Sequence, residues 1–280
     1  MRLFNLHTHT RFCDGKEAPE NYIKKAIELG FHSLGFSGHA PLPFENRIAI
    51  PESKLHLYAM EILSLKEKYK DQIEIYLALE IDYIPELLDD FSIFSNQINL
   101  DFIIGSVHFV RNPDTGKLWF IDGPKQDVYD EGLKNIFGND FQKGVTAFYH
   151  QTNQMIESQK PKIVGHLDKI KMHNRNRFFK EDDPWYRQLI DETLDLVKSN
   201  DCIVEVNTRG IYKKRSDSLF PGVDVLSKIK ALNIPVTISS DAHSPDELNK
   251  YLPEAIEILK TIGIRKIMML KNGNWSLECI

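Results

Sequence analysis

Seven short apolar runs, each followed closely by a histidine, carboxylate or amide side chain, constrain the fold of this chain more than any other feature. The first run covers residues 3–6 and leads into His7 and His9. The others cover residues 33–37, 73–79, 101–107, 162–165, 202–206 and 235–240. Segments with apolar residues at helical spacing separate these runs, which predicts parallel strands joined by helical crossovers.

The crossovers are expected to be helices at residues 19–29, 52–70, 85–96, 141–158, 186–199, 223–232 and 253–262, with a closing apolar strand at 266–270. Residues 111–140 lack a clear period and contain Pro113, Gly116, Gly123, Pro124 and Gly138. A long segment of this kind is usually a functional or disordered connection. We therefore expect one domain over residues 1–280, with a long excursion at about 111–140.

Parallel strands covered on both faces form either an open doubly wound sheet or a closed barrel. An open sheet collects its site at one switch point, whereas a barrel draws site residues from the ends of many strands. In this chain polar residues follow almost every predicted strand: His7, His9, His39, Glu80, His108, His166, Asn207, Asp241 and His243. This distribution favours an α/β barrel.

The composition excludes several classes of function. A net charge of −5 and an isoelectric point near 6.1 argue against a surface that binds duplex nucleic acid. No apolar run approaches the roughly 18 residues of a membrane span, and Met1 leads directly into the first strand, so we expect a cytoplasmic protein. The three cysteines show no C-x-x-C spacing and are expected to be reduced thiols; Cys13, beside the first histidine pair, is also considered as a ligand or nucleophile.

Histidines gather where the predicted strands end. Six of the ten stand there, while His32, His56, His150 and His173 fall in predicted helices or loops and are expected on the solvated surface. Neutral imidazole is the commonest metal ligand among side chains, and residues at i and i+2 of a strand, such as His7 and His9, leave the same face. Histidines gathered on one rim therefore indicate a metal centre.

Nine side chains are candidate metal ligands: His7, His9, Asp14, His39, Glu80, His108, His166, Asp241 and His243. A single tetrahedral zinc needs three or four protein ligands, so nine candidates with bridging carboxylates suit two or three divalent ions. Ions about 3.5–4 Å apart are a standard device for hydrolysing phosphate esters. With nitrogen and oxygen donors, Zn, Mn and Fe all fit.

These residues carry a resemblance to a known family. In order along the chain, His7-Thr8-His9, Ser37-Gly38-His39, Glu80, Ser106-Val107-His108, Gly165-His166-Leu167-Asp168 and Ser240-Asp241-Ala242-His243 match the motifs of the PHP (polymerase and histidinol phosphatase) superfamily. The match covers nearly the whole chain and is most similar to the stand-alone histidinol-phosphate phosphatases. The resemblance implies a distorted (β/α)7 TIM-like barrel with a trinuclear site.

The resemblance also implies a ligand set. His7, His9, Glu80 and Asp241 would hold one ion; Glu80, as a bridge, with His108 and His166 would hold the second; and Asp14, His39 and His243 would hold the third. Many family members have a histidine near Asp14, so the carboxylate here departs from the family pattern. The catalytic candidates are Glu80, Asp241 and His243.

The implied reaction is hydrolysis of L-histidinol phosphate to L-histidinol and phosphate, a step of histidine biosynthesis. Candidate phosphate-binding residues are Arg209, Lys213 and Arg215, which follow the sixth strand, and Lys171, from a second basic run at 169–177. Trp119, Phe120 and Asp122 in the excursion are candidate lid residues, with core packing as the alternative for any one of them.

Three other functions compete with this reading. A PHP phosphoesterase could act on another small monoester, a nucleotide, an oligonucleotide or phosphotyrosine, although the acidic charge argues against oligonucleotides. Amidohydrolase-type barrels also begin with His-x-His, but they commonly end the fourth strand in lysine where this chain has His108. A non-catalytic metal-binding module is the third, and such modules are attached to large partners. We expect a small-molecule substrate, no membrane or nucleic-acid partner, and a monomer or small homo-oligomer.

Overall fold

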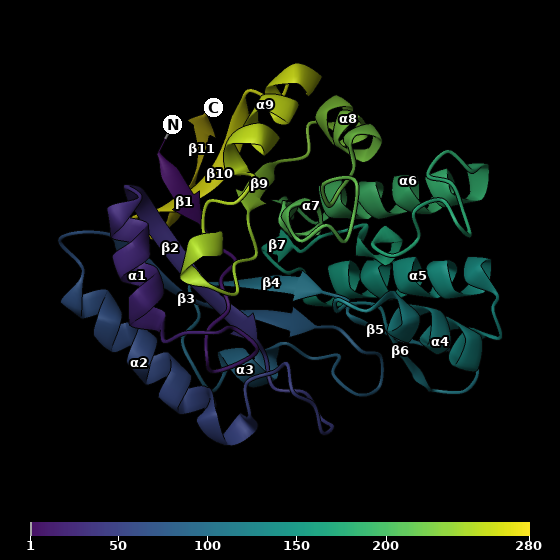
Figure 1. Cartoon of the computed structure of the whole chain (residues 1–280), viewed down its shortest axis with the longest axis horizontal. Helices are drawn as coiled ribbons and strands as arrows, with labels where there is room; N and C mark the ends of the chain where they lie inside the picture. Colours follow the sequence, from purple (N-terminus) through teal and green to yellow (C-terminus); the bar gives the residue numbers. More distant parts are fainter. Residues whose placement is uncertain (1) are drawn as a thin grey trace.

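The computed structural model describes residues 2–280, and its centre is a seven-stranded parallel sheet curled into a barrel (Figure 1). The strands are β1 (Leu3–Asn5), β2 (Phe31–His39), β3 (Glu74–Asp82), β4 (Phe102–Ser106), β7 (Ile163–Val164), β8 (Ile203–Asn207) and β9 (Val236–Ser239). They pair in the order β1-β2-β3-β4-β7-β8-β9. The predicted α/β barrel with apolar strands is confirmed, and all residues of β8 and β9 are buried.

The barrel closes just beyond the ends of its first and last strands. Thr8 pairs in parallel with Ala242, because the amide of His9 donates to the Ala242 carbonyl (2.8 Å) and the amide of Ala242 donates to the His7 carbonyl (3.1 Å). On the opposite side of the barrel the strand pairing is short, since β4 and β7 pair over only two residues each. Closure at the carboxyl ends brings the first and last strand termini together, where the polar residues gather.

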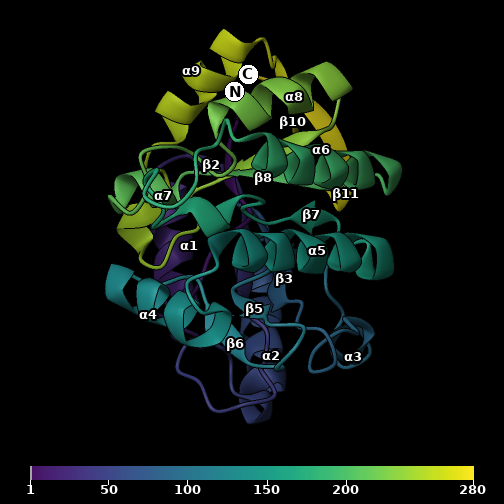
Figure 2. The same cartoon turned by 90° about the vertical axis from the view of Figure 1, so that its right-hand side faces the viewer.

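Helices surround the barrel, as Figures 1 and 2 show. They are α1 (Pro19–Glu28), α2 (Leu55–Lys68), α5 (Phe141–Gln159), α6 (Pro184–Ser199), α8 (Val223–Leu232) and α9 (Leu252–Ile262). Each buries apolar residues; α6, for example, starts with Pro184 in its first turn and buries Tyr186, Ile190 and Val197 on one face. These helices lie within two residues of the predicted bounds, apart from α2, which is preceded by the short 3-10 helix η1 (Glu52–Lys54). None of the helices within residues 2–280 is long and apolar enough to cross a membrane.

The predicted helix at 85–96 is wrong apart from one turn, α3 (Ser92–Ser95). Carboxylates compete with helix formation here: Asp89 accepts a hydrogen bond from the Glu86 amide (3.1 Å), and Asp90 accepts one from the Ser92 amide (2.8 Å). Glu86 also has a φ of 66°, which no right-handed helix accommodates.

The expected excursion at 111–140 is ordered into three short elements. A hairpin of β5 (Phe109–Arg111) and β6 (Leu118–Phe120) leads into α4 (Gln126–Phe137), which ends at Gly138 with a φ of 63°. Trp119 is fully buried, and its indole N–H donates to the Tyr129 carbonyl (2.9 Å). Trp119 therefore belongs to the core rather than to a lid.

The remaining elements lie outside the barrel ring. The strand expected at 266–270 is β10 (Lys266–Lys271), which pairs antiparallel with β11 (Asn274–Cys279) as a separate hairpin. Three short turns complete the set: η2 (Lys169–Lys171), α7 (Arg209–Tyr212) and η3 (Pro245–Glu247). They follow β7, β8 and β9, so they stand beside the polar rim.

Candidate metal centre

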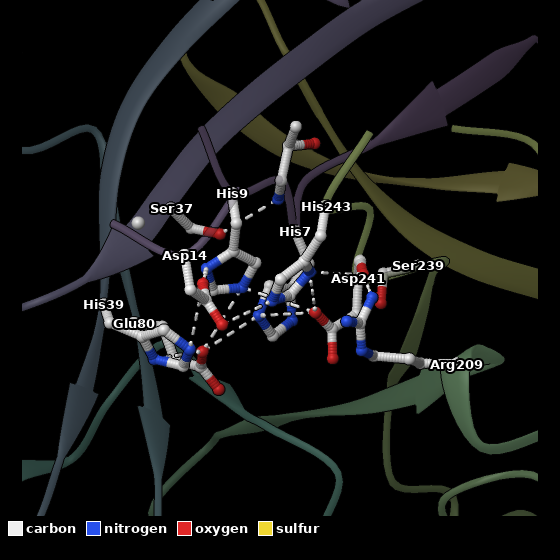
Figure 3. Close-up of polar contacts among 12 residues, drawn as sticks. His7, His9, Asp14, Ser37, His39, Glu80, Arg209, Ser239, Asp241 and His243 are labelled. Atoms are coloured by element: carbon white, nitrogen blue, oxygen red, sulfur yellow. Dashed lines mark hydrogen bonds and ion pairs between the residues drawn. The ribbon is translucent and has the colours of Figure 1, made fainter. Parts of the chain in front are cut away.

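The carboxyl ends of the strands bring all nine candidate ligands to one mouth of the barrel. His7 and His9 follow β1, His39 ends β2, and Glu80 lies opposite His39 in the β2–β3 register. His108, His166, Asp241 and His243 follow β4, β7 and β9, and Asp14 comes from the loop after His9. Figure 3 shows seven of these candidate ligands with their side chains pointing toward one another: His7, His9, Asp14, His39, Glu80, Asp241 and His243.

Glu80 occupies the middle of the group. Its Oε2 lies 3.2 Å from His7 Nε2 and 3.1 Å from His39 Nδ1. Its Oε1 lies 2.9 Å from His166 Nε2 and 3.6 Å from His108 Nε2. Oε2 also lies 3.5 Å from His9 Nε2, so the two oxygens of this buried carboxylate face different sets of imidazoles, which is the geometry of a bridging ligand.

Asp241 and Asp14 complete the arrangement on the side away from His166. Asp241 Oδ1 lies 3.3 Å from His9 Nε2 and 3.4 Å from His243 Nδ1. Asp14 Oδ2 lies 3.2 Å from His243 Nε2, and its Oδ1 is 3.8 Å from His39 Nε2. The Asp14 side chain is 28% exposed, so this end of the group meets solvent.

Buried atoms without hydrogen bonds test whether these residues fit metal ions. Four such atoms face the centre: His7 Nε2, His9 Nε2, His39 Nδ1 and Asp241 Oδ1. Leaving buried polar atoms without partners is costly, and native structures rarely do so without a function. Three sets of side chains can each converge on one ion, namely His9, Asp14, His39 and His243; His7, His9 and Asp241; and His39, Glu80 and His108. The residues therefore fit divalent cations.

A glycine allows His166 to approach the centre. A Cβ on Gly165 would lie 2.4 Å from Ser106 Oγ, the hydroxyl that donates to Glu80 Oε1 (2.7 Å). No other residue fits at this position without moving that hydroxyl. Close packing against Ser106 therefore explains why glycine precedes His166 in this motif.

Two buried carboxylates stand behind the histidines, and the sequence analysis missed both. Glu205, within β8, accepts a hydrogen bond from His7 Nδ1 (2.5 Å). Asp82, at the end of β3, lies 3.1 Å from His108 Nδ1 and accepts the His108 amide (2.6 Å). The available signal was a charged residue inside an otherwise apolar strand, which needs a buried partner.

Burial and charge set the protonation of the centre before any metal binds. Burial lowers the pKa of His9 to about 4, with help from the neighbouring His243. Burial also opposes protonation of His108, but the Asp82 carboxylate outweighs it and raises the His108 pKa to about 9. Burial opposes ionisation of Glu80 and Asp241, yet the surrounding histidines hold the pKa of both carboxyls well below the usual range. Both carboxylates are therefore charged and available to cations.

The four predicted phosphate-binding cations lie in different environments. Arg209 Nη1 donates to the Asp241 carbonyl (2.7 Å) and lies 3.4 Å from Glu247 Oε2, while Lys213 pairs with Glu247. Arg215 Nη1 is 3.8 Å from Asp122. Lys171 is buried and pairs with Asp168 (2.7 Å) and Glu181 (3.0 Å), neither of which is a candidate ligand. Arg209 is thus the predicted cation that directly contacts a candidate-ligand residue.

Lys169 is a further cation at the centre that the sequence analysis noted only as the start of a basic run. Its ammonium lies 3.2 Å from His108 Nε2 and 2.9 Å from Asp122 Oδ2, and its side chain is 4% exposed. Burial lowers its pKa, but Asp122 more than compensates, so Lys169 stays charged. Asp122 thereby faces the centre from the excursion, whereas Phe120 packs against Phe109.

The structure bears on the alternative role of Cys13 and corrects the expectation for His173. Cys13 Sγ lies 3.6 Å from His9 Nδ1, but burial, with the nearby Asp14 charge, raises the pKa of this thiol to about 12, so it is no thiolate at neutral pH. His173, expected on the surface, is buried, and its Nε2 pairs with the Gly123 carbonyl (3.0 Å). It links the loop after β7 to the excursion.

Comparison with known proteins identifies the relatives of this chain. A histidinol-phosphatase of Bacillus subtilis is 29% identical over 86% of this chain and 94% of its own length, and a probable histidinol-phosphatase of Schizosaccharomyces pombe is 28% identical over 95% and 89%. Among solved structures, a putative histidinol phosphatase from Listeria monocytogenes superposes with a TM-score of 0.80 at 24% identity, covering 90% of this chain and 99% of that one.

The histidinol phosphate phosphatase from Lactococcus lactis, solved with zinc, L-histidinol and phosphate, superposes with a TM-score of 0.72 at 20% identity and covers 98% of both chains. At these identities the two superpositions show a shared fold. The sequence model of the PHP domain matches residues 5–209, which include the last residue of β1 and all the strands from β2 to β8. Since that match spans well over half of the chain, this protein belongs to the PHP domain family.

Proposed function

We propose that this protein is a metal-dependent phosphomonoesterase that hydrolyses L-histidinol phosphate to L-histidinol and phosphate. The observation that carries the proposal is the cluster of buried, unpartnered ligand atoms at the barrel mouth. The relatives supply the substrate: histidinol-phosphatases match over most of their length, and the Lactococcus structure holds both products of this reaction.

The proposed centre holds two to three ions. Glu80 and Asp241 lie between groups of histidines, so they are placed to bridge ions or to hold the ion shared with His7 and His9. His108 and His166 would bind a second ion, and Asp14, His39 and His243 a third. Nitrogen and oxygen donors without a thiolate fit Zn, Mn or Fe, and the Lactococcus structure contains zinc.

Divalent ions at such a site lower the pKa of water toward about 7 and so supply a nucleophile at neutral pH. The protein's own residues would hold and orient the substrate and neutralise the charge of its phosphate. Arg209 and Arg215 approach the centre from the segment after β8, and Lys169 from the segment after β7, so a phosphate there would meet cations on more than one side. Lys213 and Lys171 are placed less directly, since each already pairs with acidic side chains.

His243 lies at the mouth, where its catalytic part would be to hold the third ion beside the substrate. Its side chain is 10% exposed, and its Nε2 lies 3.2 Å from Asp14, whose own side chain reaches solvent. Glu80 and Asp241, in contrast, are almost fully buried, so their catalytic part is to fix charge within the centre. Asp122 carries a negative charge near this mouth and would face the cationic end of histidinol phosphate, which bears an ammonium and an imidazole.

Phosphate release from a panel of substrates tests the function. The panel contains L-histidinol phosphate, a generic aryl phosphate, a nucleotide and phosphotyrosine, each with and without added Mn or Zn after treatment with a chelator. We expect metal-dependent release with the highest kcat/KM for L-histidinol phosphate. A higher kcat/KM for another monoester would support the second candidate, a PHP phosphoesterase of different specificity. The cytoplasmic location and the oligomeric state stay predictions.

A further inference from the structure

Glu205 gathers more hydrogen bonds than any other carboxylate around the centre, yet it faces away from the mouth. Its Oε1 accepts from His7 Nδ1 (2.5 Å) and Ser239 Oγ (2.6 Å), and its Oε2 accepts from the His166 amide (2.9 Å) and Asn207 Nδ2 (3.2 Å). It is 1% exposed, and among residues 2–280 no lysine or arginine lies within ion-pair distance of it. A buried carboxylate without a cationic partner is stabilised by the groups that donate hydrogen bonds to it, so its position and theirs are coupled.

We propose that Glu205 is a positioning residue that fixes the metal-binding form of His7 and the placement of His166. A carboxylate can only accept, so the proton of neutral His7 must sit on Nδ1. The Nε2 lone pair then points at the centre, where it lies 3.2 Å from Glu80 and has no hydrogen bond. This inference rests on the proposed metal centre.

The second oxygen of Glu205 stabilises strained backbone beside the centre. His166 has a φ of 22° and Asp241 a φ of 51°, both in the left-handed region that side chains other than glycine disfavour. The His166 amide donates directly to Glu205, and Asn207 Nδ2 contacts both Glu205 and Asp241 Oδ2, each at 3.2 Å. One carboxylate therefore supports ligands that follow β1, β7 and β9, three elements distant in sequence.

The variant Glu205→Gln separates the charge and tautomer from the shape. The His166 amide cannot reverse its polarity, so the oxygen of the new side-chain amide would face His166 and its NH2 would face His7. His7 Nδ1 would then have to accept, which moves its proton to Nε2, the atom required for metal binding. We expect metal affinity to fall about 10–100-fold, the usual effect of losing such a partner.

Two further variants provide the controls. Glu205→Asp keeps an acceptor-only group but leaves a gap of one methylene, so positioning predicts that it retains more metal than Glu205→Gln. A purely structural role predicts the reverse, because Gln preserves the shape. Ser239→Ala removes one donor but leaves the bond to His7, so we expect its metal content to match the unmodified protein.

The experiment measures bound zinc by elemental analysis against a competing chelator, together with nitrogen NMR of the histidine rings in zinc-loaded protein. In the unmodified protein we expect the His7 proton on Nδ1, a readout that needs no variant to fold. A proton on Nε2, or Glu205→Gln holding zinc as tightly as the unmodified protein and Glu205→Asp, would overturn the inference. Absence of zinc binding by the unmodified protein would instead overturn the proposed function.

Discussion

The proposed metal centre has two halves that are built differently. In the inner half, His7 and His108 each have a buried carboxylate behind the ring, Glu205 and Asp82 respectively. In the outer half, the ring nitrogens of His39 and His243 face acidic groups of the centre itself and the Asp241 backbone, as far as residues 2–280 show. Asp14 comes from a loop and is 28% exposed. The inner half is therefore preorganised by the barrel, whereas the outer half is organised mainly by its own members.

This difference predicts that the two halves bind their ions with different strength. Ligands held from behind cannot easily turn, so they should retain their ions firmly. Ligands at the mouth meet solvent and would contact an arriving phosphate, so they should exchange their ion more readily.

Glu80→Gln should cause the largest loss, because Glu80 contacts His39 of the outer half as well as His7, His108 and His166 of the inner half. Removing its charge takes away several kcal/mol of charge stabilisation, so we expect turnover to fall at least about 10³-fold. Steady-state kinetics, with circular dichroism to verify folding, provide the measurement. Activity within tenfold of the unmodified protein would contradict the bridging role.

Metal removal should then proceed in steps. We expect the ion held by Asp14, His39 and His243 to dissociate first, with an affinity about 10–100-fold below that of the inner ions. Elemental analysis along a series of chelator concentrations measures this. Asp14→Asn should remove the first step and leave the later ones, while simultaneous loss of all ions would show that the two halves do not differ.

Arg209→Ala tests whether phosphate binds on the Asp241 side of the mouth. A charge-assisted hydrogen bond to phosphate contributes about 1.5–3 kcal/mol, so we expect kcat/KM for phosphomonoesters to fall about 10–100-fold. Arg187→Ala, at an exposed arginine on α6, is the matched control and should have no effect. Unchanged kinetics for Arg209→Ala would transfer phosphate binding to Arg215, Lys213 or the run at 169–177.

The sequence predicted the candidate ligands of this centre better than the carboxylates that hydrogen-bond to those ligands. Apart from Asp14, which came from the family resemblance, the candidate ligands were found from one repeated relation between an apolar strand and the residues after it, and the barrel places all of them at one mouth. Glu205 and Asp82 were not predicted because their partners lie 198 and 26 residues away in the sequence, and no local pattern reveals pairing over such separations. The ordered excursion was likewise hidden, since its hairpin and α4 depend on packing around Trp119. Long-range pairing was the information that local patterns lacked.

The protonation of the metal-free histidines should also distinguish the two halves, and we expect this to be the smallest of the effects. Burial lowers the pKa of His7 and His108, but Glu205 and Asp82 overcome it: the His7 pKa lies well above its usual value and that of His108 is about 9. His39 has no such support, and burial together with His9 lowers its pKa. At pH 7 metal-free His7 and His108 are therefore protonated, while His39 is already neutral.

Metal binding to the inner half must displace those protons, so affinity there should rise with pH by up to about tenfold per unit for each proton released, and the part due to His108 should end as pH passes about 9. Affinity in the outer half should change little across the same range. Titration calorimetry in buffers of different ionisation enthalpy counts the protons released at each step. Equal proton release at the early and late steps would show that the carboxylates behind His7 and His108 do not set the protonation of the centre.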